Sequence, residues 1–206
     1  MKNGRLIIIV VMLLALTALS FIDDSEHISN RADKEVVKMR VDTSATKTKK
    51  IKKATKSFDE YRESIAWSES RGNYKVVNKY GYLGKYQFGK AALKDLGLNN
   101  VSRVEFLNNE DLQERAFIGL LSINKYRLRK YIDYVGSTIN GIKVTESGML
   151  AASHLVGAKS VKKWLKSNGK KNRADANGTT VEHYMRLFGG YDVSSIVTKR
   201  KVKIKY

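Results

Sequence analysis

The chain contains no cysteine and only three histidines: His27, His154 and His183. Without cysteine it can form neither a disulfide nor a lipid anchor attached to a cysteine, so any stability outside the cytosol must come from packing alone. The histidines are not part of a His-Glu-x-x-His sequence, which excludes the usual zinc-peptidase pattern. We therefore expect neither a metal ion nor another cofactor.

Acidic residues are few compared with basic ones. The chain has 20 Asp and Glu against 39 Lys and Arg, a formal net charge of +19. Much of this excess lies in residues 47–56 and 199–205. Such charge favours an anionic partner, such as an anionic envelope polymer or a membrane surface. The alternatives are a solvated, self-repelling linker and a nucleic-acid-binding protein, and the second of these rests on charge alone.

The N-terminus has the layout of an export signal. Two positive charges within Met1–Arg5 precede a run over residues 6–18 that is apolar except for Thr17, as in a signal peptide. Small residues just before Phe21 would allow cleavage there, whereas an uncleaved segment would remain as a membrane anchor. We predict that residues 1–22 are one or the other, and that the protein is exported to the periplasm or cell envelope.

The rest of the chain divides into three parts. Residues 23–56 are polar, with no sustained apolar period, so they cannot bury enough surface to fold alone and we predict a basic flexible tether. The remaining length and its apolar content suit one ordinary domain, which we place at residues 57–190. Residues 191–206 would then be a basic C-terminal tail.

Helical signals dominate the predicted domain. Ser57 and Glu60 form a capping box that predicts a helix start, and Gly72 is the natural stop just beyond Glu69. Apolar spacing, a second capping box and terminal glycines predict further helices at residues 89–96, 109–134 and 179–188. We therefore expect a mainly α fold with little strand.

A carboxylic acid, glycines and side-chain amides follow one another closely after Glu69. Asn73 comes first, then Gly81 and Gly84, and Gln87 stands eighteen positions after Glu69. An acid at a helix end followed by a polar, Gly-punctuated loop suits a polyhydroxylated ligand. An acid that donates a proton near neutral pH needs apolar surroundings, which we expect Trp67 and Tyr86 to supply in part.

This spacing resembles the catalytic core of the soluble lytic transglycosylases, lysozyme-like enzymes that cleave peptidoglycan glycan strands. In that family a Glu-Ser pair is followed by Gly-Leu-Met-Gln at the same distance. Here the second motif is Gly84-Lys85-Tyr86-Gln87, so Lys and Tyr replace Leu and Met. The resemblance implies that Glu69 is the catalytic acid and that four nearby residues bind substrate: Ser70, Asn73, Tyr86 and Gln87.

Two later segments extend the resemblance. Residues 149–161 are similar to the family's Ala-Tyr-Asn-Ala-Gly signature, with His154 at the Tyr position and Leu155 at the Asn position. This implies a substrate contact for His154, against the alternative of a satisfied core histidine. Tyr184 matches a family Tyr that returns to the catalytic Glu; the alternative is an amphipathic core residue.

The resemblance covers roughly residues 58–188 and implies a monomeric, lysozyme-like (α+β) domain with a substrate cleft. Glu69 would protonate the bond between N-acetylmuramic acid and N-acetylglucosamine, then deprotonate the 6-hydroxyl to leave a 1,6-anhydro end. A hydrolytic lysozyme is one alternative, but it would ordinarily need a second carboxylate, and none is obvious in the motif. A non-catalytic peptidoglycan-binding or envelope assembly protein is another, favoured by the amide lost at Leu155.

Overall fold

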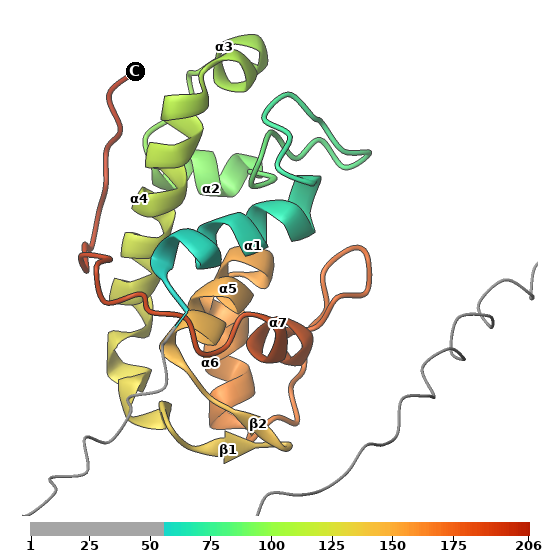
Figure 1. Ribbon diagram of the computed structural model, residues 1–206, viewed down its shortest axis with the longest axis vertical. Helices are drawn as coiled ribbons and strands as arrows, with labels where there is room; N and C mark the ends of the chain where they lie inside the picture. The colour runs from blue at the N-terminus through green and yellow to red at the C-terminus, as the bar shows by residue number, and fades with distance from the viewer. Residues whose placement is uncertain (1–55) are drawn as a thin grey trace, which may run out of the picture. The chain divides into compact units, whose positions relative to one another are not determined.

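The computed structural model describes residues 56–206, so the predicted signal or anchor and nearly all of the predicted tether lie outside the described residues. The described part is mostly helical, with one small antiparallel sheet (Figure 1), which confirms the mainly α class. Its elements are α1 (Phe58–Ser70), α2 (Lys90–Asp95), α3 (Arg103–Asn108), α4 (Glu110–Leu128), the 3-10 helix η1 (Arg129–Tyr134), β1 (Thr138–Ile139), β2 (Ile142–Lys143), α5 (Glu146–Val156), α6 (Ala158–Lys166) and α7 (Val181–Leu187).

Helix α1 begins and ends where the sequence predicts. Ser57 Oγ accepts a hydrogen bond from the Glu60 amide at 3.2 Å, and the Glu60 carboxylate accepts one from the Ser57 amide. Arg71 ends the helix in the left-handed conformation at φ 57°, and Gly72 follows at φ 78°. The buried face of the helix consists of Tyr61, Ile65 and Ala66, and Glu69 lies in its last turn.

The core is built around α5, whose residues 147–153 are all buried. This helix packs against α4, α6 and α7, and Figure 1 shows it between α4 on one side and α7 on the other. The small residues Ala151 and Ala152 are fully buried, which allows neighbouring helices to approach closely. Within residues 56–206, no helix has both the length and the apolar character to cross a membrane.

The long helix predicted over residues 109–134 is shorter in the structure. It is α-helical only as far as Leu128, and the next six residues form the 3-10 helix η1. None of the residues of η1 is fully buried, and only Tyr131 and Tyr134 of this segment pack partly against the core. A tighter 3-10 turn is a common way for an α-helix to end.

Residues 191–206 also differ from the prediction. We expected a basic tail that follows the domain, but in the structure this segment packs on the domain. The Lys199 amide donates to Ser122 O at 3.2 Å, and the Ile204 amide donates to Leu96 O at 3.1 Å. Gly119 leaves room for this contact: a Cβ added there would lie 3.1 Å from Val202 and 3.3 Å from Ile204.

The same segment clamps the start of α1. The Asp192 amide donates to Lys56 O at 2.7 Å, and the Tyr191 hydroxyl lies 2.9 Å from the Ser64 hydroxyl. The Tyr191 ring packs at 5.5 Å from the Tyr61 ring. Residues 191 and 192 therefore hold the entrance of the first helix.

Candidate active site

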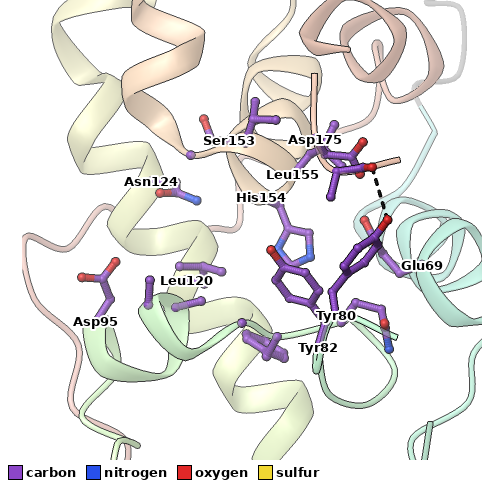
Figure 2. A pocket seen from close by; sticks show the side chains of 18 of the residues that line it. Glu69, Tyr80, Tyr82, Asp95, Leu120, Asn124, Ser153, His154, Leu155 and Asp175 are labelled. Atoms are coloured by element: carbon purple, nitrogen blue, oxygen red, sulfur yellow. Dashed lines mark hydrogen bonds between the residues drawn. The ribbon is translucent and has the colours of Figure 1, made fainter. Parts of the chain in front are cut away.

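Two adjoining cavities meet at Glu69 and form one cleft. Their volumes are about 340 Å³ and about 500 Å³. The first, here called the apolar half, is also lined by Phe88, Leu120 and Leu155, and the second, the polar half, by Lys79, Thr179 and Tyr184. Figure 2 shows side chains around the apolar half. Six residues line both halves: Glu69, Asn78, Tyr80, Gln87, Asp175 and Asn177.

Glu69 is held by a single side chain from α7. The Tyr184 hydroxyl donates a hydrogen bond to Glu69 Oε1 at 2.7 Å, and no other side-chain hydrogen bond to Glu69 occurs within residues 56–206. Burial raises the pKa of Tyr184, and the charge of Glu69 and their hydrogen bond raise it further. The phenol therefore stays protonated and acts as a donor. The structure brings these two residues together as the resemblance implied.

Gln87 lies in the cleft on a strained backbone. It occupies the left-handed region at φ 51°, in a tight turn closed by paired hydrogen bonds between Leu83 and Phe88. Its side-chain amide donates to Gly84 O at 2.9 Å. Gly84 is required in this turn, because its φ is +72° and an added Cβ would lie only 2.0 Å from the buried Gln113 side chain.

His154 lines the apolar half from the last turn of α5. Its Nε2 lies 2.8 Å from the Tyr86 carbonyl oxygen, and because a carbonyl can only accept, Nε2 must carry the proton. Its other nitrogen, Nδ1, is buried without a hydrogen-bond partner in residues 56–206. The ring packs edge-on against Phe88 and Phe117.

Three predicted substrate-binding residues do not line the cleft. Ser70 donates its hydroxyl to Lys85 O at 2.7 Å, and Asn73 accepts from the Lys75 amide at 2.8 Å in a turn. Tyr86 is fully buried, with its hydroxyl on Glu114 at 2.8 Å. The placement of Ser70, Asn73 and Tyr86 in the substrate site is therefore corrected: their side chains hold the loop and the core.

Trp67 does not surround Glu69 either. It is 60% exposed and lines neither half of the cleft. Its ring stacks instead with the Arg71 guanidinium at 5.0 Å. The apolar walls of the cleft come from Phe88 and from residues of α2, α4 and α5.

Lys85 and Tyr86 belong to a partly buried group of charged and phenolic side chains, here called the ion cluster. Lys85 is only 5% exposed, and its Nζ lies 2.8 Å from Glu63 and 3.0 Å from Glu114. Glu114 also accepts from Tyr86, and from two further residues: Arg62 at 3.1 Å and Tyr74 at 2.7 Å.

The ion cluster shifts the titration of its members. Burial alone would raise the pKa of Glu114, but hydrogen bonds from Tyr74, Lys85 and Tyr86 outweigh it and lower the pKa below the usual 4.5. Burial opposes the charge on Lys85, but its hydrogen bonds to Glu63 and Glu114 raise its pKa overall. Both side chains therefore stay charged near neutral pH.

Asp175 is a second acid in the cleft that was not predicted. It lines both halves together with Glu69. Its Oδ1 accepts from the Asn177 amide at 2.9 Å and the Thr179 amide at 2.8 Å, which fixes the carboxylate in a turn. The only signal in the sequence is a turn pattern, Asp-Ala-Asn-Gly-Thr, which carries no information about the distant Glu69.

The loop that carries Asp175 contacts the loop that follows α1. Asn78 Oδ1 accepts from the amides of Tyr80 and Tyr82, which forms a turn, and both tyrosines line the cleft. The Tyr80 hydroxyl donates to Ala176 O at 3.3 Å, the contact drawn as a dashed line in Figure 2. The two loops therefore meet beside Glu69.

Asn124 is a further cleft residue that the sequence did not indicate as functional. It lines the apolar half from α4, is 1% exposed, and its amide nitrogen is buried without a partner in the described residues. Such a group destabilises the fold by roughly 1–3 kcal/mol. Its position within an apolar helical pattern of the sequence indicates only that it lies in the core.

Within residues 56–206, no group of three or more His, Asp or Glu side chains is placed to hold a metal ion. The side chains that line the cleft offer carboxylic acids, phenols, imidazoles, amides, hydroxyls and two cationic groups. Comparison with known proteins gave no match to a family model, to a curated protein or to a solved structure. The assignment of function therefore rests on the residues and their geometry.

Proposed function

We propose that the protein is an exported, monomeric, lysozyme-like lytic transglycosylase that cleaves peptidoglycan between N-acetylmuramic acid and N-acetylglucosamine. The observation that carries the proposal is the position of Glu69. It lies where the two halves of the cleft meet, and one phenol holds it. An acid between two binding regions is suited to act on a bond whose two sugars occupy those regions.

The contact with Tyr184 suggests how Glu69 would transfer protons. Since Oε1 accepts the phenol O–H at 2.7 Å, the carboxyl proton belongs on Oε2, which delivers it to the glycosidic oxygen. The carboxylate that forms keeps its hydrogen bond from Tyr184. It then takes the proton of the muramic 6-hydroxyl as that oxygen attacks the anomeric carbon, so one acid serves both steps.

Hydrolysis is the second candidate, and Asp175 is the observation in its favour. A carboxylate that lines the same cleft as Glu69 could activate water or stabilise the positive charge on the sugar ring. The product would then carry a reducing end instead of a 1,6-anhydro ring. The two chemistries differ by one water in the mass of the product.

A non-catalytic binding or assembly protein remains the third candidate. Leu155 lines the apolar half at the position where the family has an amide. The intact pair of Glu69 and Tyr184 favours an enzyme. We also propose that the exposed cations of the C-terminal segment contact anionic envelope polymers or a membrane surface, and not nucleic acid: Lys199, Arg200, Lys201, Lys203 and Lys205.

The test is mass spectrometry of muropeptides released from purified peptidoglycan by the full chain and by Glu69→Gln. Anhydro-muramyl products from the unaltered protein, and none from Glu69→Gln, would support the transglycosylase. Glu105→Gln, which alters an exposed acid on α3, is the matched control and should keep full activity. Reducing-end products would support the hydrolase, and retained binding without products would leave the binding protein.

A further inference from the structure

We infer that α6 and the segment after it form a docking surface for a linear phosphodiester polymer of the cell envelope, whose repeats are polyols. The inference goes beyond the proposed function: it rests on the proposed export of the chain but not on chemistry at Glu69. Residues 157–174 contain no acid, and all their cations except the partly exposed Lys162 are exposed. The surface, here called the α6 basic surface, consists of these seven cations: Lys159, Lys162, Lys163, Lys166, Lys170, Lys171 and Arg173.

Four of these cations share one face of α6. At the spacing of an α-helix, the lysines at positions 159, 162, 163 and 166 fall within about 100° of arc. The opposite arc carries the apolar residues, which are buried in the core: Ala158, Val161, Trp164 and Leu165. One side of the helix therefore packs in the core, and the other side is cationic.

The α6 basic surface is not neutralised by nearby acids. None of its seven cations forms an ion pair within residues 56–206. The helices α5 and α7 pack on α6, and each contains one acid. Glu146 of α5 lies 3.4 Å from Lys125. Glu182 of α7 accepts from Trp164 Nε1 at 3.0 Å and from Asn140 at 2.6 Å, so both acids are already engaged.

This concentration of charge is unfavourable for the helix itself. Lys159 and Lys163 are like charges four positions apart, as are Lys162 and Lys166, and such pairs destabilise a helix. Lys159 also lies in the first turn, where the helix dipole disfavours a cation. The Tyr131 ring offsets part of this, with the Nζ atoms of Lys162 and Lys166 at 5.8 and 5.7 Å from its centroid. A bound polyanion would remove the repulsion.

The kind of cation favours phosphodiesters. Six of the seven cations are lysines. An ammonium group acts as a point charge on a flexible stem, whereas a guanidinium forms paired hydrogen bonds with a planar carboxylate. A row of point charges matches a flexible chain of singly charged phosphates through charge density and needs no fixed geometry.

Membranes and single-stranded nucleic acids match the α6 basic surface less well. An interfacial helix inserts its apolar face into the membrane, but the apolar face of α6 is buried, and residues 157–174 expose no large hydrophobic side chain. Single-stranded nucleic acid stacks its bases on aromatic side chains, and the single aromatic residue of this stretch, Trp164, is fully buried. A polyol phosphate has neither acyl chains nor bases and requires neither feature.

The α6 basic surface continues toward the cleft. Three of its cations lie in residues 170–173, and Asp175, Ala176 and Asn177, which follow closely, line the cleft. Figure 1 shows the chain leaving α6 and forming a loop beside α7. A phosphate polymer attached to a glycan strand would therefore be held next to the strand in the cleft.

The test is binding of end-labelled poly(glycerol phosphate) to the full chain, measured by fluorescence anisotropy. The surface variant combines Lys159→Gln, Lys163→Gln and Lys170→Gln, which leaves the lysines that contact Tyr131 in place. We expect it to bind at least about tenfold more weakly than the unaltered chain at about 50 mM salt. The slope of log affinity against log salt should become shallower by about 2, at roughly 0.7 for each lost contact.

A matched control separates this surface from the net charge of the chain. The control variant combines Lys75→Gln, Lys90→Gln and Lys94→Gln, which lie at exposed positions outside the α6 basic surface and remove the same charge. Its affinity should fall by no more than about twofold, because it retains all seven contacts. Equal losses in the two variants would overturn the inference, since the polymer would then respond to net charge alone.

Thermal unfolding distinguishes a binding role from a structural one. Without polymer, the surface variant should have a midpoint equal to or above that of the unaltered protein, because like-charge pairs are removed. Addition of polymer should raise the midpoint of the unaltered protein more than that of the variant. A midpoint of the surface variant clearly below that of the unaltered protein would mean that the lysines are structural and would overturn the inference.

Two competing partners are titrated at the same phosphate concentration: vesicles of phosphatidylglycerol and phosphatidylcholine, and a single-stranded polynucleotide. If either binds more tightly than poly(glycerol phosphate) and loses affinity in the surface variant, the choice of a polyol phosphate is overturned. Release of muropeptides without binding of the polymer would overturn this inference and leave the proposed function standing. Binding of the polymer without release of muropeptides would do the reverse.

Discussion

Glu69 and Glu114 are two acids on either side of the same loop, and their surroundings are opposite. Glu114 accepts hydrogen bonds from four side chains, Arg62, Tyr74, Lys85 and Tyr86. Glu69 accepts from Tyr184 alone within the described residues. A satisfied carboxylate stabilises the fold, whereas a carboxylate with unused capacity at a cavity is available to a ligand.

The same contrast extends to the neighbours of each acid. Arg62 Nε is the only buried side-chain nitrogen or oxygen of the ion cluster without a hydrogen-bond partner in residues 56–206, and Glu63 Oε1 lies 3.9 Å from it. In the cleft, Asn124 and His154 each have a buried nitrogen without a hydrogen-bond partner among residues 56–206, and Gln87 has a left-handed backbone. Two of the three buried side-chain atoms without a hydrogen-bond partner in residues 56–206 therefore belong to residues that line the cleft.

The largest expected effect is the loss of activity on substitution of Glu69, which substitution of Glu114 should not reproduce. Glu69→Gln should lower glycan cleavage by about 10²–10⁴-fold, because it removes the general acid, with little change in thermal midpoint. Glu114→Gln should lower the midpoint clearly and reduce cleavage per folded molecule far less. Cleavage rates and thermal unfolding of both variants check this. Equal effects of the two variants on both measurements would contradict the contrast.

Removal of a cation from the ion cluster should also destabilise the fold. Lys85→Met removes one of the two cations beside Glu63 and Glu114, the other being Arg62. We expect a loss of about 1.5–3 kcal/mol in the free energy of unfolding, because the half-buried Glu114 loses a charged hydrogen-bond donor. Urea unfolding measures this. Lys94→Met, at an exposed position on α2, should change stability by less than about 0.5 kcal/mol.

The next effect appears as pH falls. The folded pKa of Glu114 is depressed, so its contribution to stability is present above the usual value of 4.5 and is lost as the pH falls through the folded pKa. The difference in free energy of unfolding between the unaltered protein and Glu114→Gln should therefore be constant near neutral pH and narrow below about pH 4.5. A difference that widens in acid would contradict the assignment.

Removal of the Tyr184 hydroxyl tests the hydrogen bond that this residue donates to Glu69. Tyr184→Phe keeps the packed ring but loses the hydrogen bond to Oε1, so we expect cleavage to fall about 10–100-fold, and stability to change by less than about 1.5 kcal/mol. Steady-state rates with soluble glycan strands measure this effect. Tyr191→Phe removes a hydroxyl from the α1 clamp and should leave the rate unchanged.

The smallest effect on stability concerns the strained turn. Gln87→Gly relieves a left-handed backbone but removes the hydrogen bond to Gly84 O, so the free energy of unfolding should change by less than about 1 kcal/mol. Saccharide affinity should nevertheless fall, because the amide leaves the cleft. Calorimetric titration and urea unfolding on the same sample compare the two quantities.

The sequence predicted what local spacing determines. The capping box at Ser57, the stop near Gly72 and the position of Glu69 in the last turn of α1 all depend on residues close in the chain, and the structure contains them. Local spacing could not tell which way successive side chains point in the tight turn after Gly84. There Lys85 and Tyr86 contact the ion cluster while Gln87 lines the cleft.

What the sequence missed depends on pairs of residues that are far apart in the chain. Asn124 and Asp175 reach the cleft only because α4 packs against α5 and the loop before α7 contacts the loop after α1. The packing of residues 191–206 was missed for a similar reason. Their alternation of Lys with Val202 and Ile204 suits one buried side, but it does not identify Gly119 as the surface that receives it.

The clamp on α1 has a mechanical consequence. Tyr191 and Asp192 hold the chain at Lys56, so a pull on the polypeptide that precedes Lys56 is borne first by these contacts. Glu69 lies at the opposite end of the helix, roughly 17 Å away at a rise of about 1.5 Å per residue. Tension at the point of attachment therefore loads one end of α1, while the acid at the other end keeps its position relative to Tyr184.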